Sequence, residues 1–123
     1  MGNSLKAVAY IRLSPGWSTR DDDRLGIDAQ REDIEAWSTR EGVEMVAWLQ
    51  DINVSGDVPP EDRPGLLDAL TALHEHEAGV FIVARRDRLS REVERGAVIR
   101  LMIRQHGAVL RSADGKSDEA IGY

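Results

Sequence analysis

The sequence predicts a three-layer α/β/α fold, in which helices cover both faces of a mostly parallel sheet of four to five strands. Residues 6–13 and 79–84 are apolar at almost every position, which is typical of strands buried on both faces. Strand-like and helix-like segments alternate three times, and such alternation produces βαβ units with parallel strands. A chain of 123 residues has the length of one compact domain.

The first half of the chain yields its elements in order. Residues 6–13 form the first expected strand, and Ser14-Pro15-Gly16 ends it because proline cannot continue a sheet ladder. A polar loop leads to a helix expected over residues 28–41, which a glycine stops. The second strand is expected over residues 43–49. Residues 51–62, rich in Gly, Pro and Asp, are expected to form a loop.

The second half of the chain also alternates helical and strand patterns. Pro64 suits the first turn of a helix, and leucines then repeat at helical spacing: Leu66, Leu67, Leu70 and Leu73. Residues 79–84 form the clearest buried strand. A helix over residues 91–105 is expected to begin at Ser90 as its N-cap. A short last strand is expected over residues 108–111.

Composition indicates a soluble globular protein, with 41% hydrophobic and 31% charged residues. The sequence has no apolar run of about 20 residues that could cross a bilayer, and its start lacks the apolar core of a secretory signal. Its lack of cysteine is compatible with the cytoplasm, where we expect it to reside. The net charge of −6 is uneven, because residues 80–111 hold eight arginines against three acidic residues.

Polar residues follow three of the expected strands. Ser14, Asp51 and the run Arg85–Arg88 each come directly after a strand end. Parallel α/β sheets bind ligands outside the carboxyl ends of their strands. We therefore expect these segments to converge on one edge of the sheet and to form the functional site there.

The residue types at this edge favour phosphoryl transfer. Ser14 offers a hydroxyl, Arg12 lies two residues earlier, and Arg88 and Arg91 flank a helix start whose free N–H groups favour an anion. Asp87 stands between basic neighbours, which favour its charged form. Fixed guanidinium groups can stabilise the charge that develops when a hydroxyl attacks a phosphodiester, without a metal or other cofactor.

Other chemistries have less support. The three histidines show no metal-ligand spacing, and we expect no metal site. No histidine stands near a serine as a base, and no Gly-x-Ser-x-Gly elbow occurs. No P-loop or Gly-x-Gly-x-x-Gly turn follows a strand.

Five short motifs, in order along nearly the whole chain, resemble those of the serine recombinase family of resolvase and invertase type. They are Tyr10-Ile11-Arg12-Leu13-Ser14, Gly26-Ile27-Asp28-Ala29-Gln30-Arg31, Asp51-Ile52-Asn53-Val54-Ser55-Gly56, Arg63-Pro64-Gly65-Leu66 and Asp87-Arg88-Leu89-Ser90-Arg91. The resemblance implies a DNA recombination or integration enzyme of the kind that mobile elements carry.

The resemblance also implies roles for individual residues. Ser14 would attack the scissile phosphate and form a 5′-phosphoserine link to DNA, without metal or cofactor. Arg12, Arg88 and Arg91 would hold the phosphate, and Asp87 would orient these arginines or handle the proton of the leaving group. The remaining residues would assist these five: Arg63 and Gln30 as further catalytic residues, and Tyr10, Asp51 and Ser55 as supporting ones, with Tyr10 fitting simple packing equally well.

Family members continue into a long dimerisation helix and a DNA-binding region. We therefore expect residues 1–123 to be the catalytic domain of a longer protein, inactive in isolation. The parent protein is expected to bind double-stranded DNA, to form a dimer and a synaptic tetramer, and to have no membrane partner. The alternatives are a catalytically silent regulatory or relic domain of the same fold, and an unrelated α/β domain that binds anions.

Overall fold

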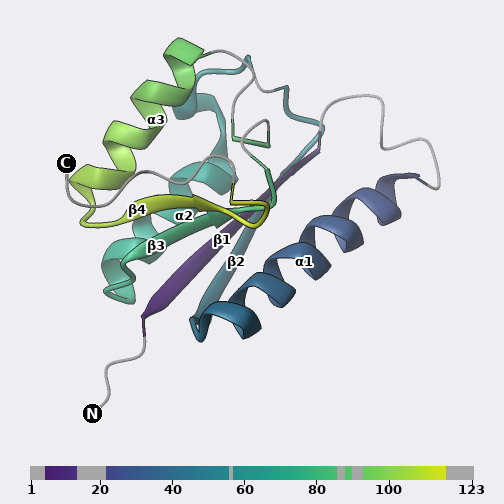
Figure 1. Ribbon diagram of the computed structural model, residues 1–123. Coiled ribbons are helices and arrows are strands. Elements are labelled where there is room, and N and C mark those ends of the chain that lie inside the picture. Colours follow the sequence, from purple (N-terminus) through teal and green to yellow (C-terminus); the bar gives the residue numbers. More distant parts are fainter. Residues whose placement is uncertain (1–4, 14–21, 56, 86–87, 90–92, 116–123) are drawn as a thin grey trace.

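The computed structural model describes residues 5–13, 22–55, 57–85, 88–89 and 93–115, and it confirms the predicted three-layer fold (Figure 1). Four parallel strands form the sheet within these ranges: β1 (Lys6–Leu13), β2 (Glu44–Ile52), β3 (Val80–Val83) and β4 (Val109–Ser112). Their order is β2-β1-β3-β4. β1 is therefore a central strand, in agreement with its apolar sequence.

Helices cover both faces of this sheet. α1 (Asp22–Glu41) packs Ile34 and Trp37 against one face, while α2 (Pro64–Glu75) and α3 (Val93–Gln105) pack against the other (Figure 1). Successive β1 side chains point to opposite faces, so Ala9 joins the α1 core and Tyr10 joins the α2/α3 core. Each buried large apolar side chain contributes about 1.5–3 kcal/mol relative to an exposed one.

Several boundaries differ from those expected. α1 begins at Asp22, not at residue 28, so it is six residues longer at its amino end than the sequence pattern predicts. β2 continues to Ile52, so Asp51 lies within a strand and not in a loop. Asp51 belongs to the sheet because it pairs with Arg12 of β1 and its side chain is buried. Leu67 is exposed among the leucines of α2, and the expected N-cap Ser90 lies outside the described residues.

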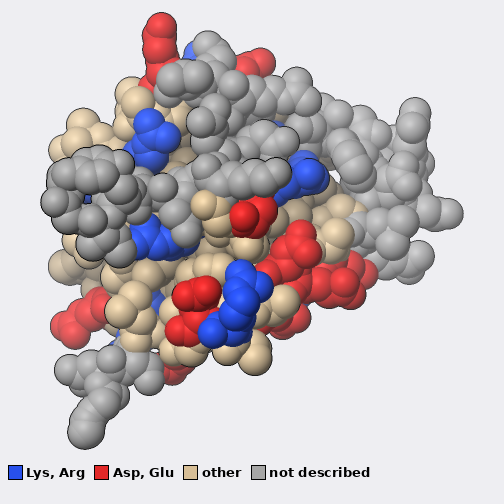
Figure 2. All heavy atoms as spheres, in the orientation of Figure 1, with Lys and Arg blue, Asp and Glu red and all other residues tan. Residues whose placement is uncertain are grey.

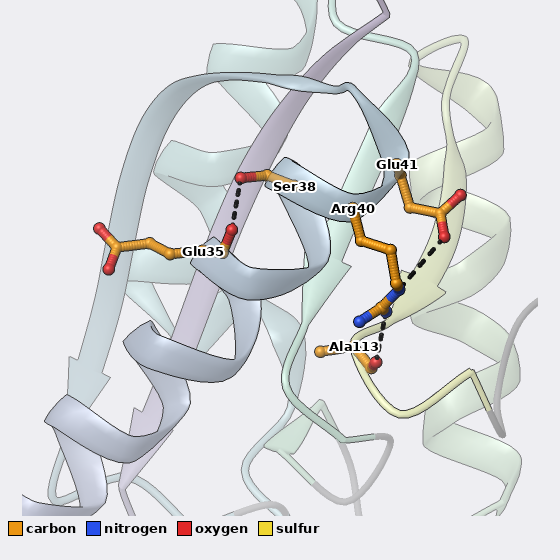
Figure 3. Close-up of polar contacts among 5 residues, drawn as sticks. All are labelled: Glu35, Ser38, Arg40, Glu41 and Ala113. Atoms are coloured by element: carbon orange, nitrogen blue, oxygen red, sulfur yellow. Dashed lines mark hydrogen bonds and ion pairs between the residues drawn. The ribbon is translucent and has the colours of Figure 1, made fainter.

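The carboxyl end of α1 contacts the segment that follows β4 (Figure 3). The Arg40 Nη2 atom donates a hydrogen bond of 3.4 Å to the Ala113 carbonyl, and its Nε atom lies 3.5 Å from the Glu41 carboxylate. Ser38 Oγ donates to the Glu35 carbonyl one turn earlier. These contacts are exposed, and exposed ion pairs contribute at most about 1 kcal/mol.

Surface charge is distributed unevenly over the layers. Acidic side chains gather over α1 in Figure 2, and residues 26–41 include five acidic residues against two arginines. None of the described helices has the length and apolar character needed to cross a membrane.

Candidate active site

The carboxyl ends of β1 and β2 and the loop after β3 meet at one edge of the sheet, as the sequence predicts. Arg12 pairs with Asp51 in the parallel β1–β2 register. Asn53 then adopts a left-handed backbone with a φ of 64°, a conformation that asparagine tolerates better than most residues. This turn brings the Val54 N–H within 3.0 Å of the Leu13 carbonyl. The loop after β2 is thereby fastened to the end of β1.

Arg12 links three segments at this edge. Its side chain is buried, its Nε atom donates to the Arg88 carbonyl at 2.8 Å, and its Nη1 atom donates to the Val54 carbonyl at 2.7 Å. The Arg12 carbonyl accepts a hydrogen bond of 3.2 Å from Gln30 Nε2 of α1. The loops after β2 and β3 are therefore held to the end of β1 by one guanidinium group, and α1 is held to it by an amide.

A second buried network lies behind this edge and joins Tyr10, Asp51 and Arg63. The Tyr10 hydroxyl donates to Asp51 Oδ2 at 2.7 Å and accepts from Arg63 Nε and Nη2 at 3.3 and 3.0 Å. The Arg63 guanidinium carbon also lies 5.5 Å from the centre of the Tyr10 ring, within cation–π range. All three side chains are buried. Hydrogen bonds to charged partners are stronger than those between neutral groups, so this network is rigid.

Burial is the main influence on the ionisation of Tyr10. It raises the pKa of the phenol well above its ordinary value, because the phenolate would lose its hydration. The positive charge of Arg63 acts in the opposite direction, and the hydrogen bond to Asp51 raises the pKa further. The hydroxyl therefore stays protonated at neutral pH and remains the donor to Asp51.

Asp51 also caps the amino end of α2. Its Oδ1 accepts from the Gly65 N–H at 2.7 Å, and its Oδ2 accepts from the Leu66 N–H at 3.0 Å. These are two of the N–H groups that a helix start leaves without intrahelical partners. The helix comes so close that a Cβ atom at Gly65 would lie 2.2 Å from the Gln50 carbonyl oxygen. The absence of a side chain at Gly65 is what permits this contact.

The structure brings together six of the predicted site residues. Arg12, Gln30 and Arg88 form one linked group, and Tyr10, Asp51 and Arg63 form the other. Ser55 lies in the loop after β2, where its Oγ accepts from the Asp57 N–H at 3.1 Å. The predicted residues Ser14, Asp87 and Arg91 lie outside the described residues.

The sequence motifs by themselves assign no role to Gly65 or to the Val54 carbonyl, although both hold the site together. A signal for Gly65 was present. Pro64 marks a helix start, and a helix start needs an acceptor for its free N–H groups. The sequence has no signal for the Val54 carbonyl, because every residue carries the same main-chain carbonyl group whatever its side chain.

The charged groups at this edge and directly behind it have an excess of positive charge, which favours an anion. Among the described residues, the buried charged side chains are two arginines, Arg12 and Arg63, and one carboxylate, Asp51. Arg88 adds a half-buried guanidinium. No group of three or more His, Asp or Glu residues in the described part of the chain is arranged to hold a metal ion. An excess of fixed positive charge in a site shielded from water can bind a phosphate and stabilise charge that develops on it.

One family of known domains matches nearly the whole chain. Residues 7–122 match the family described as "Resolvase, N terminal domain". No curated protein sequence matches the chain.

Solved structures with the same fold include several recombinases. A resolvase family site-specific recombinase from Streptococcus pneumoniae is 15% identical, with 97% of this chain and 78% of that one covered and a TM-score of 0.76. The N-terminal catalytic domain of TP901-1 integrase is 19% identical, with coverage of 89% and 78% and a TM-score of 0.73. The C-terminal catalytic domain of IS1535 TnpA, an IS607-like serine recombinase, is 25% identical, with coverage of 87% and 70% and a TM-score of 0.62.

Proposed function

Because this chain belongs to the resolvase N-terminal domain family, we propose that it is the catalytic domain of a site-specific serine recombinase and that Ser14 is its nucleophile. The observation that carries the proposal is the position of Arg12, whose guanidinium group joins the loop after β2 to the loop after β3. Ser14 follows Arg12 by two residues, and Arg88 belongs to the second loop. The convergence of the segments that contain Arg12, Val54 and Arg88 supports this assignment.

The proposed reaction is a transesterification. Ser14 Oγ attacks the phosphorus of the scissile phosphodiester, a P–Oγ bond forms, and the P–O3′ bond breaks. The serine gives up its proton, and the departing 3′ oxygen gains one, with Asp87 as the candidate carrier. Arg88 and Arg91 hold the phosphate and stabilise its developing charge, while Arg12 and Gln30 keep the surrounding segments in place.

Rejoining reverses this step with a new partner strand. The 3′-hydroxyl of the partner attacks the phosphoserine and releases Ser14. The covalent intermediate conserves the energy of the phosphodiester bond, so the proposal requires neither a metal nor a nucleotide. It extends to a parent protein that binds double-stranded DNA and assembles into a dimer and a synaptic tetramer.

The test is capture of the covalent intermediate. The full protein that contains this chain is incubated with DNA from both ends of the genetic element that encodes it. The reaction is stopped with detergent, and the DNA-linked residue is identified by mass spectrometry. We expect a phosphoserine at Ser14, and no adduct in the Ser14→Ala variant. Ser38→Ala is the matched control, because Ser38 lies on α1 and bonds only within its own helix turn in the described structure (Figure 3).

Two results would contradict the proposal. An adduct that persists in Ser14→Ala would assign the chemistry to another residue. Specific binding to the element's ends with no adduct in the unaltered protein would favour the silent regulatory domain instead.

A further inference from the structure

The guanidinium group of Arg63 points toward Tyr10 in the interior of the fold. The side chain has no exposed surface. Nε and Nη2 both donate to a single acceptor, the Tyr10 hydroxyl, and the group lies against the Tyr10 ring. A guanidinium group that binds phosphate uses two of its N–H groups side by side. In Arg63 such a pair is already occupied by Tyr10.

The main chain of Arg63 is held as firmly as its side chain. Its N–H donates to the Pro60 carbonyl at 3.0 Å, and its carbonyl accepts from the Leu67 N–H at 3.0 Å. The residue therefore closes a short 3-10 turn and opens α2. The following Pro64 further restricts its backbone. Turning Arg63 toward a DNA strand would require breaking contacts at both ends of the residue.

Other residues connect Arg63 to the edge of the sheet at which the proposed site lies. Arg63 orients the Tyr10 hydroxyl, which donates to Asp51, and Asp51 pairs with Arg12 in the sheet. Three residues after Asp51, the Val54 carbonyl accepts from Arg12 Nη1. A shift of Asp51 would therefore displace the carbonyl that holds the Arg12 guanidinium.

We propose that Arg63 is a positioning residue that acts on DNA cleavage through Tyr10 and Asp51, and is not a ligand of the phosphate. The inference rests on the proposed recombinase function. The alternative is that Arg63 itself binds the phosphate, and one observation favours it. Arg63 Nη1 is buried and has no hydrogen-bond partner among the described residues, so it is the atom that a phosphate ligand would use.

The experiment separates DNA binding from the cleavage step. The full protein is compared with Arg63→Gln, Tyr10→Phe and the double variant on the same element-end DNA. The rate of adduct formation is measured at saturating DNA, and affinity is measured over a range of salt concentrations. Arg88→Gln serves as the comparison for a phosphate contact, and Arg104→Gln, an exposed α3 arginine, as the surface control. Urea unfolding confirms that each variant is folded under the assay conditions.

We expect Arg63→Gln and Tyr10→Phe each to slow adduct formation, by about a hundredfold if the reacting groups are displaced by about 1 Å. The double variant should be no slower than the single ones, because both substitutions break one network. The dependence of log affinity on log salt should keep its slope, whereas Arg88→Gln should reduce it by about 0.9, the value for one lost phosphate contact.

A slope reduced by about 0.9 in Arg63→Gln, or a double variant whose rate loss is the product of the single losses, would overturn the positioning role. If Arg63→Gln does not fold, Tyr10→Phe decides alone, and an unaltered adduct rate in that variant would refute the inference. Failure of the unaltered protein to form any adduct would instead refute the proposed function, whatever the variants do.

Discussion

Gly65→Ala places one methyl group where the structure has no room for it. The added Cβ atom would lie 2.2 Å from the Gln50 carbonyl oxygen and 2.8 Å from Asp51 Oδ1. Ordinary van der Waals contact begins near 3.4 Å, so the start of α2 would have to move away from β2 by about 1 Å. The neighbours are main-chain atoms of a strand and a carboxylate with three hydrogen bonds, so they cannot yield easily.

The size of the effect follows from these contacts. Overpacking costs about 1–3 kcal/mol. Lengthening the 2.7 Å bond from the Gly65 N–H to the Asp51 carboxylate costs about 1.5–3 kcal/mol more, because the acceptor is charged. Alanine is the better helix former by about 1 kcal/mol, which acts in the opposite direction. The free energy of unfolding should therefore fall by about 1.5–5 kcal/mol.

Urea unfolding followed by circular dichroism measures this change. Gly79→Ala is the matched control, because a Cβ atom there meets nothing within 4 Å and the backbone φ lies outside the left-handed region. The control should leave stability unchanged or raise it by up to about 1 kcal/mol through the unfolded chain. A Gly65→Ala chain as stable as the unaltered one would show that the approach of α2 to β2 is not tight, and would refute the reasoning.

Four further substitutions test other features of the fold. Glu77 and Gly107 occupy equivalent left-handed positions after α2 and α3, with φ of 52° and 83°; in urea unfolding, Glu77→Gly should raise stability by up to about 1 kcal/mol, and Gly107→Ala should lower it by about 1–2 kcal/mol. The raised pKa of Tyr10 stabilises the fold below pH 10.0, the ordinary tyrosine pKa, and this contribution is lost as pH rises above it; alkaline unfolding should show a steeper decline in the unaltered chain than in Tyr10→Phe, and equal slopes would contradict the buried phenol. Arg31 lies 4.2 Å from the centre of the Trp48 ring; Arg31→Ala should cost about 0.5–1 kcal/mol in urea unfolding, and no loss would mean that this cation–π contact is not maintained in solution.

The fold was predictable where the local pattern and the tertiary environment agree. The apolar run of β1 predicts a strand buried on both faces, and the structure places it in the centre of the sheet. The predicted element boundaries were wrong where the local pattern and the tertiary environment differ. Asp51 is polar and stands in a stretch rich in turn residues, yet it belongs to β2 because three donors from residues 10, 65 and 66 satisfy its carboxylate. Those donors are distant in sequence, so no local pattern indicates them.

The candidate site was predictable in its location but not in its connections. Strand order and parallel strands place Arg12 and Arg88 at one edge, as the general rule for α/β sheets predicts. The sequence could not show that Arg12 bonds to main-chain carbonyls, since carbonyl groups occur at every residue and carry no sequence signal. The sequence also could not distinguish Arg63, which is buried and bonded to Tyr10, from an arginine that faces a ligand.

The sequence by itself determined the fold class, the motif order and the edge of the sheet at which chemistry is expected, because apolar periodicity and turn residues act over short distances. Only the tertiary structure decided which charged groups are buried, what each guanidinium group contacts and why residue 65 must be glycine. These depend on the distances between segments that are 14 to 76 residues apart along the chain. Burial and hydrogen bonding are properties of such assembled neighbours, and they assign different tasks to side chains of the same type.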